Sequence, residues 1–73
     1  MNELIFVIDQ APEGGYTARA LGASIFTEGD SMEELRRNVR EATECHFDEG
    51  GSARPKMIRL HFVREEVLPL TPA

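Results

Sequence analysis

The sequence has few of the residues on which several classes of small protein depend. Its 73 residues include one cysteine, Cys45, and no tryptophan. A single cysteine cannot form an intrachain disulfide, so the chain is no disulfide scaffold and a reducing compartment is expected. The apolar run at residues 4–8 has only five members, too few for a signal-peptide core or a membrane span. We therefore expect a cytoplasmic protein without a membrane partner.

Basic residues are also scarce, since eight Lys and Arg stand against thirteen Asp and Glu, for a formal net charge of −5. That balance argues against a domain whose whole surface binds nucleic acid, and it is compatible with binding a basic protein. The length allows one domain, whose core can supply roughly 3–5 kcal/mol. We therefore expect self-association, as a homodimer or a higher homo-oligomer.

Motifs that bind cofactors or metals are absent as well. The two glycine pairs belong to no phosphate-binding motif, and no set of four ligands has zinc spacing. Cys45 and His46 are neighbours on a predicted helix, where side chains point ~100° apart, so they form no nucleophile–base pair. His46 is expected to pack in the core or an interface. The sequence thus predicts no catalytic residue, cofactor or metal, and no enzyme activity.

Three strands are predicted in the first 28 residues. Residues 4–8 read as a strand central in a sheet or buried on both faces, which Asp9 ends by capping the turn that follows. "QAPEGG" reads as a hairpin loop and "GYTARA" as the second strand. In that strand one face carries Tyr16, Ala18 and Ala20 and the other Thr17, Arg19 and Leu21. "SIFTE" is the third strand, and short links favour an antiparallel meander.

The segment "GDSMEEL" predicts the start of a helix. Ser31 and Glu34 have the spacing of a capping box, and acidic residues in the first turn suit the helix dipole. The helix should end near Asp48, before a glycine pair. Its apolar stripe consists of Met32, Leu35, Val39, Ala42 and His46, so it should pack on one face of the sheet.

The last strand is predicted in "MIRLHFV", with Ile58, Leu60 and Phe62 on one face and Arg59, His61 and Val63 on the other. The predicted fold is a small α+β domain of order β-β-β-α-β over residues 1–65, with an antiparallel meander sheet, one helix on one face, and a tail at 66–73. The residues expected to be mainly buried are Phe6, Ile8, Leu35, Val39, Ala42, Ile58, Leu60 and Phe62.

Three motifs, "GGYTAR", "TEGDSMEEL" and "NVREATE", together resemble the HicB antitoxin family over about residues 3–63. The resemblance implies a small β-β-β-α-β fold, a partial ribonuclease H-like fold without catalysis. It also implies a function, the neutralisation by occlusion of a HicA-like toxin, a small basic protein that cleaves mRNA. Many HicB proteins continue into a DNA-binding domain; this chain ends at Ala73, so direct DNA binding is not expected.

The contact with such a toxin is expected on the outer face and edges of the sheet, because the core occupies the helix stripe. The candidate partner-binding residues are Arg19, Arg59 and His61 on strands, with Glu13 and Asp30 at loop tips. An acidic domain that covers a basic toxin is electrostatically sensible.

Two other interpretations stay open. One is a stand-alone HicB-like domain without a toxin, acting as an oligomeric adaptor or a ligand sensor. The other is a residual metal-dependent nuclease, in which Asp9 at a strand end would act with Glu41 and Glu44 of the helix. The further carboxylates that such a site needs are missing from the last strand.

Overall fold

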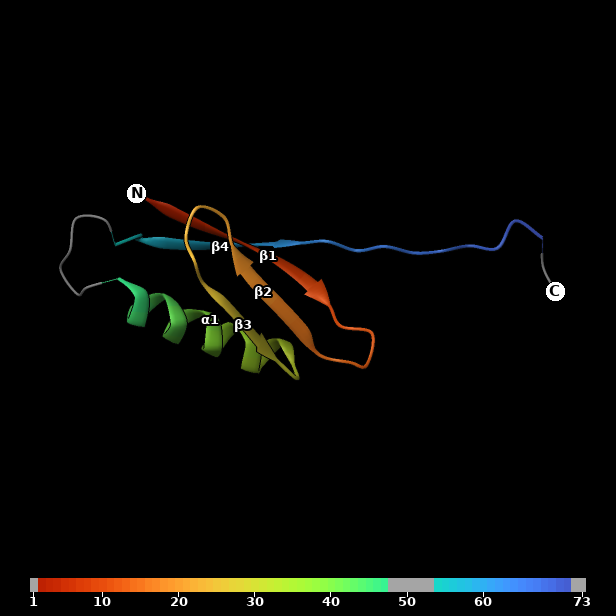
Figure 1. Cartoon of the computed structure of the whole chain (residues 1–73), viewed down its shortest axis with the longest axis horizontal. Helices are drawn as coiled ribbons and strands as arrows, with labels where there is room; N and C mark the ends of the chain where they lie inside the picture. The colour runs from red at the N-terminus through yellow and green to blue at the C-terminus, as the bar shows by residue number, and fades with distance from the viewer. Residues whose placement is uncertain (1, 48–53, 72–73) are drawn as a thin grey trace.

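The computed structural model describes residues 2–47 and 54–71 (Figure 1). The predicted helix end at Asp48 lies outside the described residues. The order of elements is the predicted β-β-β-α-β, and the domain is a small α+β fold. The elements are β1 (Glu3–Gln10), β2 (Tyr16–Ala20), β3 (Phe26–Gly29), α1 (Met32–His46) and β4 (Met57–Phe62).

The four strands form one mixed sheet in the order β3-β2-β1-β4. β1 is central, as predicted. β1 pairs with β2, and β2 pairs with β3, in the antiparallel sense. The predicted antiparallel meander is confirmed for β1, β2 and β3, but β4 pairs with β1 in parallel, so an antiparallel arrangement of all four strands is wrong. The reason is the helix: a strand–helix–strand connection returns the chain to the end where it began, so β4 runs parallel to β3 and β1.

The loop between β1 and β2 is a tight hairpin, as predicted. Gly14 N–H donates to the Ala11 carbonyl and Ala11 N–H to the Gly15 carbonyl, each at 3.0 Å. Gly14 and Gly15 have φ of 105° and 83°, which favour glycine. Asp9 does not cap this turn, because β1 continues and pairs Asp9 with Thr17. That prediction is therefore wrong.

α1 begins with the predicted capping interactions. The Ser31 hydroxyl accepts from Glu34 N–H at 3.1 Å, and the Glu34 carboxylate accepts from Asp30 N–H at 3.2 Å. The second bond thus reaches one residue before the cap rather than the cap itself. Asn38 Nδ2 donates to the Glu28 carbonyl at 2.7 Å and ties the helix to β3.

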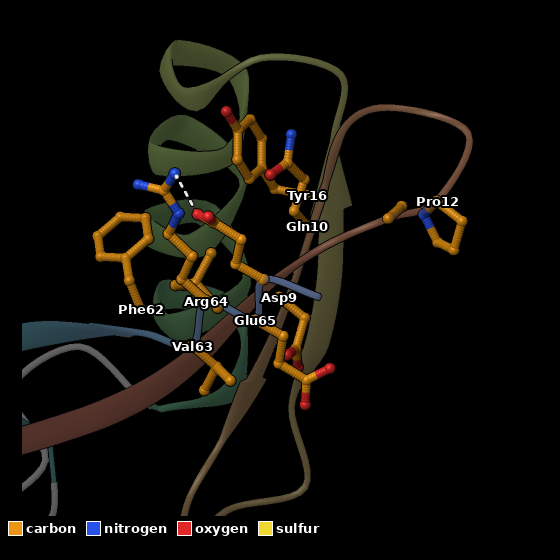
Figure 2. Close-up of a pocket in the computed structure, with 11 residues that line it drawn as sticks. Asp9, Gln10, Pro12, Tyr16, Phe62, Val63, Arg64 and Glu65 are labelled. Atoms are coloured by element: carbon orange, nitrogen blue, oxygen red, sulfur yellow. Dashed lines mark ion pairs between the residues drawn. The ribbon is translucent and has the colours of Figure 1, made fainter. Parts of the chain in front are cut away.

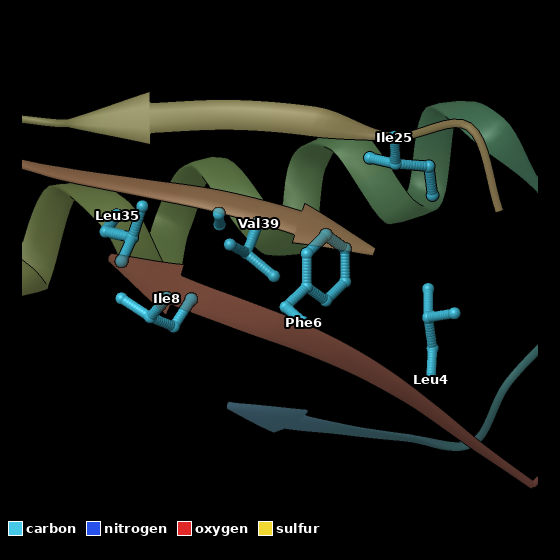
Figure 3. Close-up of a cluster of buried hydrophobic side chains, with 7 residues drawn as sticks. Leu4, Phe6, Ile8, Ile25, Leu35 and Val39 are labelled. Atoms are coloured by element: carbon cyan, nitrogen blue, oxygen red, sulfur yellow. The ribbon is translucent and has the colours of Figure 1, made fainter. Parts of the chain in front are cut away.

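The core lies between α1 and the face of the sheet that we call the inner face (Figure 3). Four predicted core residues are confirmed as buried, and Ala42, Ile58 and Leu60 are half-buried against the cluster. Phe62 is 54% exposed, so its predicted burial is wrong. The seven buried members of the cluster are Leu4, Phe6, Ile8, Ala18, Ile25, Leu35 and Val39.

Phe62 is exposed because the helix does not cover it. The α1 backbone lies against β3 and β2, whereas β4 is the edge strand on the far side of β1. Ile58 and Leu60 still pack against the core cluster, whereas Phe62, at the end of β4, is not among the described residues that do so.

The buried stripe of α1 consists of Leu35, Val39 and Thr43. Thr43 tolerates burial because its hydroxyl donates to the Val39 carbonyl at 2.8 Å. His46 is exposed, so it does not pack in the core, and its packing in an interface stays a prediction. Phe47, the C-cap residue, packs on the core instead. The two rings meet edge-to-face with centroids 4.9 Å apart.

Candidate functional site

The sheet presents its other face, which we call the outer face, away from α1. Along β1 the side chains alternate, so Leu4, Phe6 and Ile8 point into the core and Val7 points outward. Strand pairing continues a row from Val7 across the sheet: Arg19 of β2 and His61 of β4 flank Val7, and Phe26 of β3 is paired with Arg19. Phe26 is 65% exposed, so the row ends in a large apolar side chain in water.

A second row lies beside the first on the outer face. It contains Leu21, whose N–H donates to the Ile5 carbonyl at 2.9 Å, then Ile5 and its pair Arg59. Leu21 is exposed and Ile5 is half-buried. The centre of the outer face is therefore apolar, with cationic side chains set among the apolar ones.

Arg59 is held by a carboxylate on the neighbouring strand. Its Nε and Nη2 donate to the two oxygens of Glu3 at 2.6 and 3.0 Å. This bidentate hydrogen bond, with the charge of the guanidinium, lowers the pKa of Glu3, although desolvation opposes the effect. The same bond and the charge of Glu3 raise the pKa of Arg59. Arg59 can therefore donate hydrogen bonds to a partner only from the guanidinium N–H groups that do not bind Glu3.

One end of the sheet is acidic. Asp9, Thr17 and Glu28 form the row next to Val7, and Glu13 and Asp30 lie on the adjoining loops. The two loops touch, since a Cβ added at residue 15 would lie 3.5 Å from the Asp30 Cα. We call Asp9, Glu13, Glu28 and Asp30 the acidic end; all are exposed except Asp9, which is half-buried.

The five residues predicted to bind a partner thus fall into two groups. Arg19, Arg59 and His61 share the outer face, whereas Glu13 and Asp30 lie on loops at the acidic end. Sequence reasoning missed the apolar residues between them. The signal was available for β1, because any strand with Leu4, Phe6 and Ile8 on one face must place the intervening residues on the other. The missed residues are Ile5, Val7, Leu21 and Phe26.

The carboxylates of the nuclease hypothesis are not brought together. Asp9 lies on the outer face, whereas Glu41 and Glu44 are exposed on α1, which packs on the inner face. Within residues 2–47 and 54–71, no three His, Cys, Asp or Glu residues are grouped to hold a metal ion. Cys45 is free and exposed on the helix.

A groove opens where the chain leaves β4 (Figure 2). Its volume is about 680 Å³, and its walls include Tyr16, Phe62, Arg64 and Glu66. Arg64 and Glu66 form an ion pair at 3.7 Å, and both side chains are largely exposed to solvent. Residues 64–66 in one wall of the groove begin the extended segment at 64–71, which we call the arm.

Among the described residues, no helix has the length and apolar composition that crossing a bilayer requires.

Comparison with known proteins shows which family the chain belongs to. It is 54% identical to a UPF0150 protein of Archaeoglobus fulgidus over 54 residues. This matched region covers 74% of this chain and 77% of the relative. It is 40% identical over 63 residues to a UPF0150 protein of Thermotoga maritima, which covers 86% of each.

The chain belongs to the UPF0150 family. No family model matches it. No solved structure matches it either. Neither relative's name specifies an activity.

Proposed function

We propose that the protein is a HicB-like antitoxin, a cytoplasmic binding protein that neutralises a HicA-like mRNA-cleaving toxin by covering it. It acts without catalysis, cofactor or metal, and it works as a homodimer or higher homo-oligomer. The proposal joins the sequence motifs that resemble HicB to one structural observation. That observation is a sheet face that α1 does not cover, where the exposed apolar side chains Leu21 and Phe26 lie near the buried Val7. The adjoining row carries the carboxylates of Asp9 and Glu28 on either side of Thr17.

The outer face has the composition of a protein–protein interface. Interfaces between proteins have an apolar core enriched in aromatic residues and Arg, surrounded by a polar rim. Here Val7, Phe26 and Arg19 lie in the central row, and Asp9 and Glu28 lie in the next. A solvated strand face without function would be expected to carry polar side chains in its central row.

The acidic end gives the surface a preference for a basic partner. The net charge of −5 adds a long-range attraction, and the local carboxylates would orient a cationic partner as it docks. The association rate should therefore fall as salt rises, because exposed charges are screened beyond ~10 Å at 0.1 M.

Co-expression tests the proposal. The chain is produced together with any small basic protein that is encoded next to its gene, and growth, co-purification and RNA cleavage are measured. We expect growth to be restored, a complex to co-purify, and RNA cleavage by the isolated toxin to stop when this protein is added. Continued growth arrest with both proteins soluble would refute the antitoxin function.

Two charge variants test the surface. Glu13→Lys with Glu28→Lys reverses two carboxylates at the acidic end, and Glu41→Lys with Glu44→Lys makes the same change in net charge on the exposed side of α1. Only the first pair should weaken toxin binding markedly. An equal loss for both pairs would mean that net charge, rather than this surface, drives the association.

The second candidate is a stand-alone oligomeric adaptor or ligand sensor. It is favoured by the groove beside Tyr16 and Phe62 and by the arm that projects beyond it. Two findings would support this candidate over the antitoxin: an oligomeric protein whose gene has no small basic reading frame beside it, and no protection of RNA from cleavage when the protein is added.

A further inference from the structure

The arm leaves the body of the molecule with its apolar side chains in water. It continues from β4 as a long extended segment (Figure 1), and Val67, Leu68 and Leu70 are 91%, 75% and 98% exposed. The radius of gyration is 15.1 Å, whereas a compact chain of this length has about 11 Å. Removing apolar side chains from water lowers the free energy of the system, so a surface that covered the arm would stabilise the molecule.

The body carries a surface that matches such a segment. A groove of about 110 Å³ runs between α1 and β4. Val39, Ile58 and Leu60 give it an apolar floor, and Arg36 and Arg40 give it a cationic wall. β4 is an edge strand of the sheet, so within residues 2–47 and 54–71 one side of its backbone has no strand paired to it.

The arm complements this groove in charge and in periodicity. Side chains two residues apart in an extended chain point to the same side, as the Arg64–Glu66 ion pair shows. Leu68 therefore follows Glu66 on that side. An arm laid along the free edge of β4 as an added strand would bring Glu66 to the arginines and Leu68 to the apolar floor. Pro69 lacks an N–H and would limit the paired stretch to the residues before it.

An arm cannot easily reach the groove of its own chain. Val63 N–H still donates to the Ile8 carbonyl at 2.9 Å, so the chain keeps the direction of β4 past its end. A return along β4 would need a tight turn at residues 64–66, which are Arg-Glu-Glu and include no Gly, Asn or Pro. The occupant of the groove must then come from another molecule with the same arm.

We propose that two copies of this chain exchange arms. Each arm lies on the free edge of β4 in the second copy, with Leu68 in the groove and Glu66 against Arg36 and Arg40. The exchange is reciprocal, so a two-fold axis makes every contact twice and closes the assembly as a dimer. This inference rests on the proposed self-association and names the surface that produces it.

The first test changes the arm and measures the dimer dissociation constant of the full chain by sedimentation equilibrium. Leu68→Asp should raise the constant at least about thirtyfold, as for other buried interface anchors. The arm touches little of its own body, so the far-UV circular dichroism should not change. Thr71→Asp adds the same charge further along the exposed arm and should leave the constant within about twofold.

The second test reverses the proposed ion pair. Glu66→Arg and Arg40→Glu should each raise the dissociation constant at least about tenfold, because each places like charges together. The double variant restores opposite charges between positions 40 and 66 in both halves of the dimer, but it also sets the new arginine beside Arg36. Its dissociation constant should therefore fall below that of either single variant without reaching the original value. Arg37→Glu makes the same change on an exposed helical position outside the groove and should have no effect.

The outcomes separate the hypotheses. A monomeric full chain at micromolar concentration overturns both arm exchange and self-association. A dimer that Leu68→Asp does not weaken overturns arm exchange alone and leaves self-association and toxin neutralisation standing. Dissociation by Leu68→Asp without any effect of Arg40→Glu overturns the groove as the docking site. Rescue by the double variant supports the exchange, whatever the co-expression experiment gives.

Discussion

Glu3 and Arg59 join the first and last strands of the sheet by a bidentate ion pair, with Nε–Oε1 and Nη2–Oε2 distances of 2.6 and 3.0 Å. The two residues are 56 positions apart in the chain, so the pair closes the parallel contact on which the mixed sheet depends. Both side chains retain contact with solvent, at 34% and 63% exposure, and the contribution to stability is therefore small.

The pair makes stability depend on pH in the acidic range. Glu3 has a lowered pKa in the folded state, so its contribution is present above the ordinary Glu value near 4.5 and is lost as pH falls through the folded pKa. Glu3→Gln should thus be slightly less stable than the original chain at pH 7. The difference should vanish at low pH, as followed by urea midpoints from pH 7 to 2.

A matched variant isolates this effect. Glu28→Gln removes an exposed carboxylate from the same face of the sheet, where no ion pair is formed among the described residues. It should lack the small pH-dependent loss that Glu3→Gln shows. Identical pH profiles for the two variants would contradict a specific role of the Glu3–Arg59 pair.

Gly29 marks the closest approach of β3 to α1. A Cβ at this buried position would lie 2.6 Å from the Leu35 nitrogen and 2.9 Å from the Leu35 Cα, and backbone atoms cannot swing aside. Gly29→Ala should therefore cost at least about 1–3 kcal/mol by overpacking. Gly14→Ala meets no atom within 4 Å, but its φ of +105° is strained, so it should cost about 1–2 kcal/mol.

Thermal and urea unfolding of both glycine variants provide the measurement. The expected order is a larger loss for Gly29→Ala than for Gly14→Ala, together with a change in the helix signal for the first only. A Gly29→Ala protein as stable as the original would contradict the distance of 2.6 Å between a Cβ at residue 29 and the Leu35 nitrogen.

The fold was predictable wherever local chemistry decides it. Ser31 with Glu34 predicted the start of the helix, and the hairpin glycines predicted the first turn, because caps and turns depend on neighbours in sequence. The parallel position of β4 was not predictable in this way, because its partner β1 lies more than fifty residues away. The alternation in β4 is predictable from its sequence, but alternation does not tell which residues a helix covers. The exposure of Phe62 was not predictable for that reason.

The candidate site was predictable in part for the same reason. Alternation alone predicts the side of each strand on which Arg19, Arg59 and His61 lie, and strand pairing brings the three residues onto the same face. The joining of Arg59 to Glu3 depends on the register of β1 against β4, which only the structure supplies.

The helix cap gives a direct test of local stability. Ser31→Ala removes the acceptor for the Glu34 N–H and should cost about 1 kcal/mol. Ser24→Ala makes the same change in the exposed connection between β2 and β3 and should stay within about 0.5 kcal/mol. Urea unfolding measures both. Equal losses would show that the hydroxyl of Ser31 has no special role.

Core burial predicts an order among leucines. Leu35 is fully buried between α1 and the sheet, so Leu35→Ala should cost about 2–5 kcal/mol, close to the whole stability of so small a domain. Leu60 is half-buried on the edge strand, so Leu60→Ala should cost less, about 1–2 kcal/mol. Unfolding midpoints give the order, and a greater loss at Leu60 would contradict the position of α1 over β2 and β3.

The two exposed phenylalanines test which face of the sheet meets the toxin under the proposed function. Phe26 is 65% exposed on the outer face and Phe62 is 54% exposed on the inner side of the edge strand. Phe26→Ser should remove an interface anchor and weaken toxin binding by at least about 2 kcal/mol, which is roughly thirtyfold. The folding stability of the Phe26→Ser variant should change little, because the ring already lies mostly in water.

Phe62→Ser makes the same chemical change on the opposite side and should leave toxin binding intact. Titration of each purified variant against the HicA-like protein by calorimetry measures the difference. A loss for Phe62→Ser without one for Phe26→Ser would move the binding surface from the outer face to the groove beside the arm.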